Sequence, residues 1–75
     1  MDNYTNYIES NPNILLGKPV IKGTRIGVDL ILKKLSEGMK NEEILISYPT
    51  LKIADIFAAL SYSADVISKE EVIAV

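Results

Sequence analysis

The chain has 75 residues, of which 48% are hydrophobic, and its formal net charge at pH 7 is −2. It contains neither cysteine nor histidine, which excludes disulfides, zinc sites built from these residues and acid–base catalysis by histidine. No run approaches the roughly 18 apolar residues of a membrane span, and the polar start lacks the basic segment typical of a signal peptide. We therefore expect one soluble, cytoplasmic domain with no metal and no cofactor.

Residues 7–26 are predicted to form an extended β-arm. Residues 11–13 (Asn-Pro-Asn) and 22–24 (Lys-Gly-Thr) are typical turn sequences, and the β-branched Val20 and Ile21 between them favour a strand. Two or three short strands rarely form a stable sheet alone. We therefore expect the arm to pair with the arm of a second copy in a homodimer.

Residues 28–37 are predicted to form the first helix. Four apolar residues follow the spacing of one helix face: Val28, Ile31, Leu32 and Leu35. Lys33 and Lys34 lie near the C-terminal end, where the helix dipole favours cations, and Gly38 is a typical helix stop. Leu30 lies off the apolar face and is a candidate partner contact, unless it marks a second buried face.

A second helix is predicted over residues 42–47, with Asn41 as its N-cap. Its apolar residues, expected to be partly in the core, are Ile44, Leu45 and Ile46. Residues 48–51 form a short turn before a third helix, a spacing typical of a helix-turn-helix. The predicted fold class is therefore mainly α, with a short N-terminal β-arm followed by a three-helix bundle over residues 28–67.

The third helix is predicted over residues 51–67, with Thr50 as its cap. It is apolar over a wide arc, and its alanines allow a neighbour to approach closely. One apolar line along it consists of Ile53, Phe57, Leu60, Ala64 and Ile67, flanked by Ile56, Ala59 and Ser63. The tail, residues 68–75, ends in four apolar residues. Its expected contacts with a partner or a second copy are Val72, Ile73 and Val75.

Positive charge is concentrated in one part of the chain. Residues 18–34 carry a net charge of +4, whereas residues 1–17 carry −2 and residues 35–75 carry −4. Such a segment can steer an anionic partner, although a solvated basic face explains the same pattern. The candidate nucleic-acid contacts are Lys18, Lys22, Thr24, Arg25, Lys33, Lys34 and Lys52. The third helix has no Asn, Gln or Arg. If the protein binds DNA, we therefore expect the basic arm to contact it more than this helix does.

Enzymatic interpretations of residues 17–28 fail. A phosphate-binding loop needs glycine, lysine and then serine or threonine, whereas here lysine precedes glycine at residues 22–24. No histidine is present to activate a hydroxyl nucleophile. A purely structural interpretation stays open, in which Gly17 and Gly23 form tight turns and Thr24 bonds the local backbone. We predict no catalytic residue and no small-molecule substrate.

Several segments together match the pattern of one known family. They are Asn11-Pro12, residues 17–26 (Gly-Lys-Pro-Val-Ile-Lys-Gly-Thr-Arg-Ile) with Val28, then Gly38, Glu42-Glu43-Ile44-Leu45, Tyr48-Pro49 and Ala58-Ala59-Leu60. This set, spanning residues 7–63, resembles the domain-of-unknown-function family 433. Asn11 stands where aspartate is common and Gly27 where proline is common. The second change loosens the start of the first helix, because proline at the first helical position pre-sets φ.

The resemblance implies a homeodomain-like three-helix fold and a role as an antitoxin. Many family members look like antitoxins encoded beside a PIN-like ribonuclease toxin. We therefore expect a non-catalytic antitoxin of a type II toxin–antitoxin pair, which binds the toxin and, as a homodimer, operator DNA. The alternatives are a helix-turn-helix transcriptional regulator without a toxin, and a stand-alone protein-interaction module.

Overall fold

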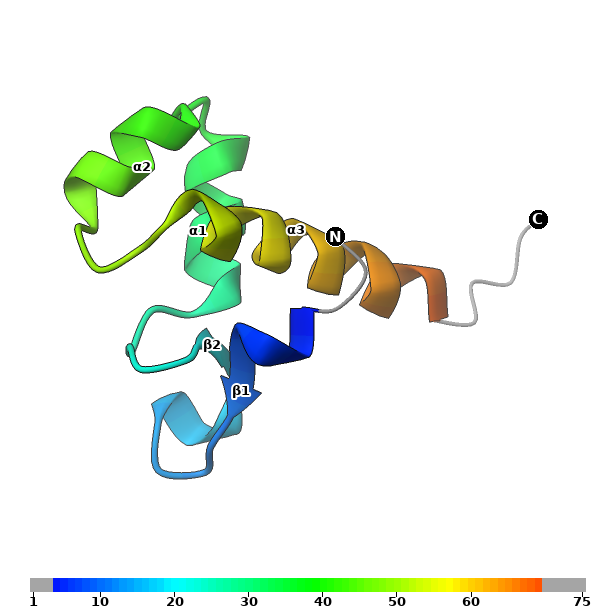
Figure 1. Cartoon of the computed structure of the whole chain (residues 1–75). Helices are drawn as coiled ribbons and strands as arrows, with labels where there is room; N and C mark the ends of the chain where they lie inside the picture. The colour runs from blue at the N-terminus through cyan, green and yellow to red at the C-terminus, as the bar shows by residue number, and fades with distance from the viewer. Residues whose placement is uncertain (1–3, 70–75) are drawn as a thin grey trace.

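A computed structural model of the chain describes residues 4–69 (Figure 1). The elements in chain order are the 3-10 helix η1 (Tyr4–Asn6), β1 (Ile8–Ser10), the 3-10 helix η2 (Leu15–Gly17), β2 (Pro19–Ile21), α1 (Val28–Ser36), α2 (Asn41–Ser47) and α3 (Ile53–Lys69). The predicted fold class is confirmed: the domain is mainly α, with a short N-terminal sheet. Within residues 4–69, no helix has both the length and the apolar composition needed to cross a membrane.

The two strands pair with each other as an antiparallel sheet within one chain. The register places Ile8 opposite Ile21, Glu9 opposite Val20, and Ser10 opposite Pro19. Val20 and Ile21 are buried, and Ile21 belongs to the same apolar core as Val28 of α1. A two-stranded hairpin is marginally stable in water unless a helix covers it. Here α1 provides that cover, and pairing of the arms across a dimer stays a prediction.

The connection between β1 and β2 contains a left-handed backbone turn. Leu15 and Leu16 have φ values of +48° and +59°, and Gly17 follows at +83°. Glycine adopts this region freely, whereas a side chain with a Cβ atom is strained there. The Leu16 side chain is also 95% exposed. The sequence did not predict this turn, because leucine has no preference for left-handed backbone.

Residues 22–24 form the second predicted turn and lead the chain from β2 to α1. Gly23 has a φ of +78°. The Thr24 hydroxyl donates to the Ile21 carbonyl at 2.8 Å and accepts from the Ile26 N–H at 3.0 Å. The Ile21 N–H in turn donates to the Ile26 carbonyl at 3.0 Å. These bonds fold the backbone sharply and fix where α1 begins.

α1 buries the face that its spacing predicted. Val28 and Ile31 are buried, and Leu32 and Leu35 are partly buried against the same core. The helix ends at Ser36, one residue before the predicted end. Gly38 follows with a φ of +92°, and its N–H donates to the Leu35 carbonyl at 3.0 Å. This geometry is typical of a glycine that terminates a helix.

α2 contributes one buried side chain to the core. It begins at Asn41, so Lys40 rather than Asn41 is the N-cap residue, and the Glu43 carboxylate accepts from the Lys40 N–H at 2.8 Å. Ile44 is fully buried, but Ile46 is 78% exposed. The prediction that Ile46 lies partly in the core was wrong, because residues two apart point to nearly opposite sides of a helix.

α3 completes the core through one of its faces. Ile56, Ala58 and Ala59 are fully buried there. The helix begins at Ile53, two residues later than predicted. The predicted cap, Thr50, is exposed, whereas the carboxylate of the buried Asp55 accepts from the Lys52 N–H at 2.9 Å. A carboxylate that reaches back to the start of its own helix satisfies an N–H that has no helical partner.

Candidate partner-binding surfaces

The solvent side of α3 carries an apolar line that we name the α3 stripe: Ile53, Phe57, Leu60, Ala64 and Ile67. The four large side chains are 43%, 47%, 42% and 63% exposed, in that order, and Ala64 is exposed as well. A surface helix normally carries polar residues on the side opposite its core face. The sequence predicted this line, but its wide apolar arc did not reveal which side faces solvent. α3 is therefore apolar on both sides.

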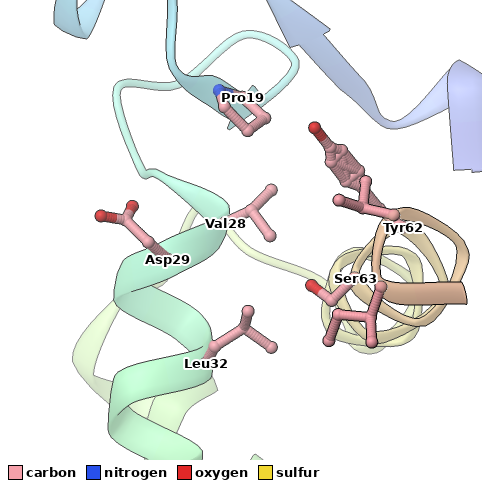
Figure 2. A pocket seen from close by; sticks show the side chains of 8 residues that line it. Pro19, Val28, Asp29, Leu32, Tyr62 and Ser63 are labelled. Atoms are coloured by element: carbon pink, nitrogen blue, oxygen red, sulfur yellow. The ribbon is translucent and has the colours of Figure 1, made fainter. Parts of the chain in front are cut away.

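An open apolar cleft lies between β2, α1 and the second half of α3 (Figure 2). Its volume is about 240 Å³, and it is lined by Pro19, Val28, Asp29, Leu32, Tyr62, Ser63, Val66 and Ile67. The second half of α3 extends beyond α1 (Figure 1). Val66 and Ile67 are consequently 40% and 63% exposed, since no other element of the described chain covers them.

Two of the three polar side chains that line the cleft have partners within the chain. The Ser63 hydroxyl donates to the Ala59 carbonyl at 2.7 Å. The Asp29 carboxylate lies 3.9 Å from the Lys18 ammonium. The remaining lining is apolar except for the Tyr62 hydroxyl. A cleft of this composition suits an apolar side chain from a partner better than a polar small molecule.

A polar network joins η1 to the second half of α3. The Tyr4 hydroxyl donates to the Asp65 carboxylate, and the Lys69 ammonium donates to the same carboxylate at 3.0 Å. The Tyr4 ring packs edge-on against the Tyr62 ring, with the centroids 5.4 Å apart. The sequence did not predict these contacts, because 61 positions separate Tyr4 from Asp65 and no residue spacing reports so distant a pair.

The network shifts the pKa values of its members. The hydrogen bond from Tyr4, with a further bond from Lys69, holds the pKa of Asp65 below its usual value near 3.8. The same bond to Asp65 raises the pKa of Tyr4 above 10.0. The pKa of Lys69 is raised by its own bond to Asp65. These shifts follow from hydrogen bonds that favour the ionised carboxylate, the neutral phenol and the charged ammonium.

The predicted nucleic-acid contacts are spread over several parts of the domain. Lys22 and Arg25 are exposed on the loop before α1, whereas Lys33 and Lys34 lie in its last turn. Lys52 is exposed directly before α3. The structure therefore divides these cations between the two ends of α1 and the start of α3.

Some of the predicted contact groups already have partners. Lys18 pairs with Asp29, and Lys34 lies 3.9 Å from Glu37. Exposed pairs of this kind contribute little to stability, so both lysines can exchange partners. The Thr24 hydroxyl makes two backbone bonds. Within residues 4–69, Lys22 and Arg25 take part in no ion pair.

The predicted partner contacts fall partly outside the described residues. Leu30 is half-buried on α1, whereas Val72, Ile73 and Val75 lie beyond residue 69. Within residues 4–69, no group of three or more acidic, histidine or cysteine side chains is placed to hold a metal ion. The sequence did not predict that apolar side chains of α3 would be exposed to solvent.

The fold and the sequence are similar to those of known proteins. A crystal structure of a DUF433 member protein from Anabaena variabilis ATCC 29413 matches with a TM-score of 0.77 and 32% sequence identity. The match covers 80% of this chain but 59% of that one. No curated protein matches significantly. Residues 8–63 match the family described as Protein of unknown function (DUF433), and this chain therefore belongs to the DUF433 family.

Proposed function

We propose that this protein is a non-catalytic antitoxin, which binds a PIN-like ribonuclease toxin through the open cleft between α1 and α3. The observation that carries the proposal is the exposed apolar lining of this cleft, in particular Val66 and Ile67. Large exposed apolar patches mark sites of interaction with other molecules, and the exposed lining of the cleft adjoins the α3 stripe at Ile67. The toxin itself is suggested by the family resemblance.

The cleft accommodates a large apolar side chain of the toxin. Burying such a side chain removes its surface and that of Leu32 and Val66 from water, which stabilises the complex. The ion pair of Lys18 and Asp29 at one side of the cleft offers charged groups for the rim of the interface. Rim charges mainly set the association rate and the choice of partner.

Co-expression with the product of the adjacent gene tests this function. We expect growth rescue and a complex that survives purification. Val66→Glu places a charge in the cleft and is expected to weaken capture at least tenfold. Ile46→Glu is the matched control, because Ile46 is exposed on α2 and does not line the cleft. Equal binding by both variants, or no complex with wild-type protein, contradicts the proposal.

A second candidate function is binding of operator DNA, and the exposed loop with Lys22 and Arg25 favours it. Both side chains are accessible to phosphates. The exposed face at the start of α3, by contrast, holds Ile53 and Phe57, which do not read base edges by hydrogen bonding. Affinity is expected to fall steeply with added salt. If Lys22→Glu combined with Arg25→Glu leaves the DNA affinity unchanged, this loop does not contact DNA.

A further inference from the structure

We infer that the α3 stripe is the interface through which two copies of this chain associate, with their α3 helices packed antiparallel. Successive stripe residues are separated by four, three, four and three positions. This alternation has a mean of 3.5 residues, the repeat with which one helix packs along another. A second α3 carries the same repeat, so it matches the stripe along its full length.

An antiparallel arrangement fits the sizes of the stripe side chains. With a two-fold axis at Leu60, Ile53 lies beside the partner's Ile67, and Phe57 lies near the partner's Ala64. Large side chains opposite small ones fill an interface without gaps. A parallel pair would instead place Phe57 against its own copy and leave space at Ala64. The order of side chains along the stripe therefore favours the antiparallel pair.

The charges of α3 also permit this interface. The Asp55 carboxylate is buried on the core side, and Asp65 and Lys69 are bonded to each other and to Tyr4. None of these three charged residues belongs to the α3 stripe, so none loses its hydration when the stripes meet. Antiparallel packing also brings the positive end of each helix dipole toward the negative end of the other.

The exposed area of the α3 stripe supplies about two thirds of what a small stable dimer buries. The exposed fractions of Ile53, Phe57, Leu60 and Ile67 are 43%, 47%, 42% and 63%, which together equal about two whole side chains. At roughly 200 Å² for each large side chain, each copy contributes about 400 Å². Both stripes together bury about 800 Å², and flanking residues such as Ser61 and Ser68 raise this toward the roughly 1,200 Å² of a small stable interface.

Sedimentation of the 75-residue chain tests the inference. We expect the wild type to be dimeric at tens of micromolar and Leu60→Glu to raise the dimer dissociation constant at least tenfold, since two carboxylates then meet at the axis. Leu16→Glu is the matched control, because Leu16 is more exposed but lies between β1 and β2. A monomeric wild type at 200 µM, or equal effects of the two variants, overturns the inference. Leu60→Ser, which adds no charge, is expected to shift the constant in the same direction, and circular dichroism shows that each variant is folded.

Mixing two variants tests the antiparallel direction. Ile53→Glu and Ile67→Lys chains are each expected to dimerise weakly. In a mixed antiparallel pair, the introduced carboxylate and ammonium lie side by side, so the mixture is expected to associate at least fivefold more tightly than either chain alone. No gain on mixing contradicts the antiparallel arrangement. Ile67 belongs to both surfaces, whereas Val66 lines the cleft and is not part of the α3 stripe. Self-association does not require the toxin, so Val66→Glu is expected to remain dimeric while it loses toxin capture, and Leu60→Glu tests the stripe at a residue outside the cleft.

Discussion

The Tyr4 hydroxyl donates a hydrogen bond to the Asp65 carboxylate, and this bond joins residues 61 positions apart. It fastens η1 to the part of α3 that extends beyond α1 (Figure 1). The edge-on contact between the rings of Tyr4 and Tyr62 lies beside it. Together these contacts hold in place the half of α3 that supplies Val66 and Ile67 to the cleft.

We predict that the stabilisation from this network depends on pH. The folded state lowers the pKa of Asp65, so the unfolded chain binds more protons near and below the usual value. Stability from Asp65 is therefore present above about pH 4 and is lost as the pH falls through the lowered pKa. The pKa of Tyr4 is raised, so its contribution is present below about pH 10 and is lost as the pH rises through the raised value.

Melting temperatures of the wild type and Tyr4→Phe measure this dependence. The variant is expected to melt at a lower temperature near pH 7, where both groups contribute fully. The difference between the two proteins is expected to shrink below pH 4, because protonated Asp65 is a weaker acceptor. A difference that stays constant from pH 3 to pH 7 contradicts the assignment of the lowered pKa to the Tyr4 bond.

We predict that Ile56→Ala removes a large share of the stability. Ile56 is fully buried, and truncation of such a residue typically costs about 2–5 kcal/mol. A domain of this length has a free energy of unfolding of about 4–11 kcal/mol. Ile46→Ala makes the same chemical change at a side chain that is 78% exposed, so its expected effect is under about 0.5 kcal/mol. Urea unfolding compares the two, and similar losses would falsify the placement of the core.

We predict that Asp55, rather than Thr50, caps the start of α3. Asp55→Ala removes the acceptor of the Lys52 N–H and is expected to cost about 0.5–2 kcal/mol. Asp55→Asn retains an acceptor oxygen and is expected to cost less. Thr50→Ala is the control and should leave the free energy of unfolding nearly unchanged. If Thr50→Ala is the more damaging substitution, the cap is not the one described.

We predict that Gly23→Ala destabilises the protein through its backbone alone. The φ of Gly23 is +78°, and a Cβ atom there would meet no other atom within 4 Å. The expected cost is therefore the left-handed penalty of about 1–2 kcal/mol. Gly23→Asn is expected to cost less, because asparagine tolerates this region better. Chemical unfolding of both variants checks the order, which would be reversed if crowding rather than φ were responsible.

The core elements could be predicted because local pattern and tertiary structure agree there. The spacing of Val28 and Ile31 correctly predicted where α1 lies, and the turn residues around Gly23 correctly predicted a turn between β2 and α1. The predicted start of α3 was two residues too early, because a threonine directly before an apolar helix is a typical N-cap. The residue that caps the helix, Asp55, lies in its first turn, and its carboxylate accepts from the N–H of Lys52, which precedes the helix.

The interaction surfaces could not be predicted in the same way. A helix that is apolar over so wide an arc is poorly oriented by its few polar residues, so Leu60 and Ile56 are equivalent in sequence until the fold buries one of them. The cleft depends on how far α3 extends past α1, which is a property of helix packing rather than of residue spacing. The bond between Tyr4 and Asp65 requires the whole intervening chain to be folded.

The left-handed turn at Leu15 and Leu16 bears on how this chain would respond to selection in the laboratory. Its two φ values are +48° and +59°, a conformation that asparagine or glycine adopts at less cost. A library screened for heat resistance alone should therefore replace these leucines early. A library screened for capture of a partner should keep them if the fully displayed Leu16 is an anchor. Comparing which residues each library enriches at positions 15 and 16 therefore distinguishes two cases. In one, the strained turn has no role in binding. In the other, binding requires the leucines despite the strain.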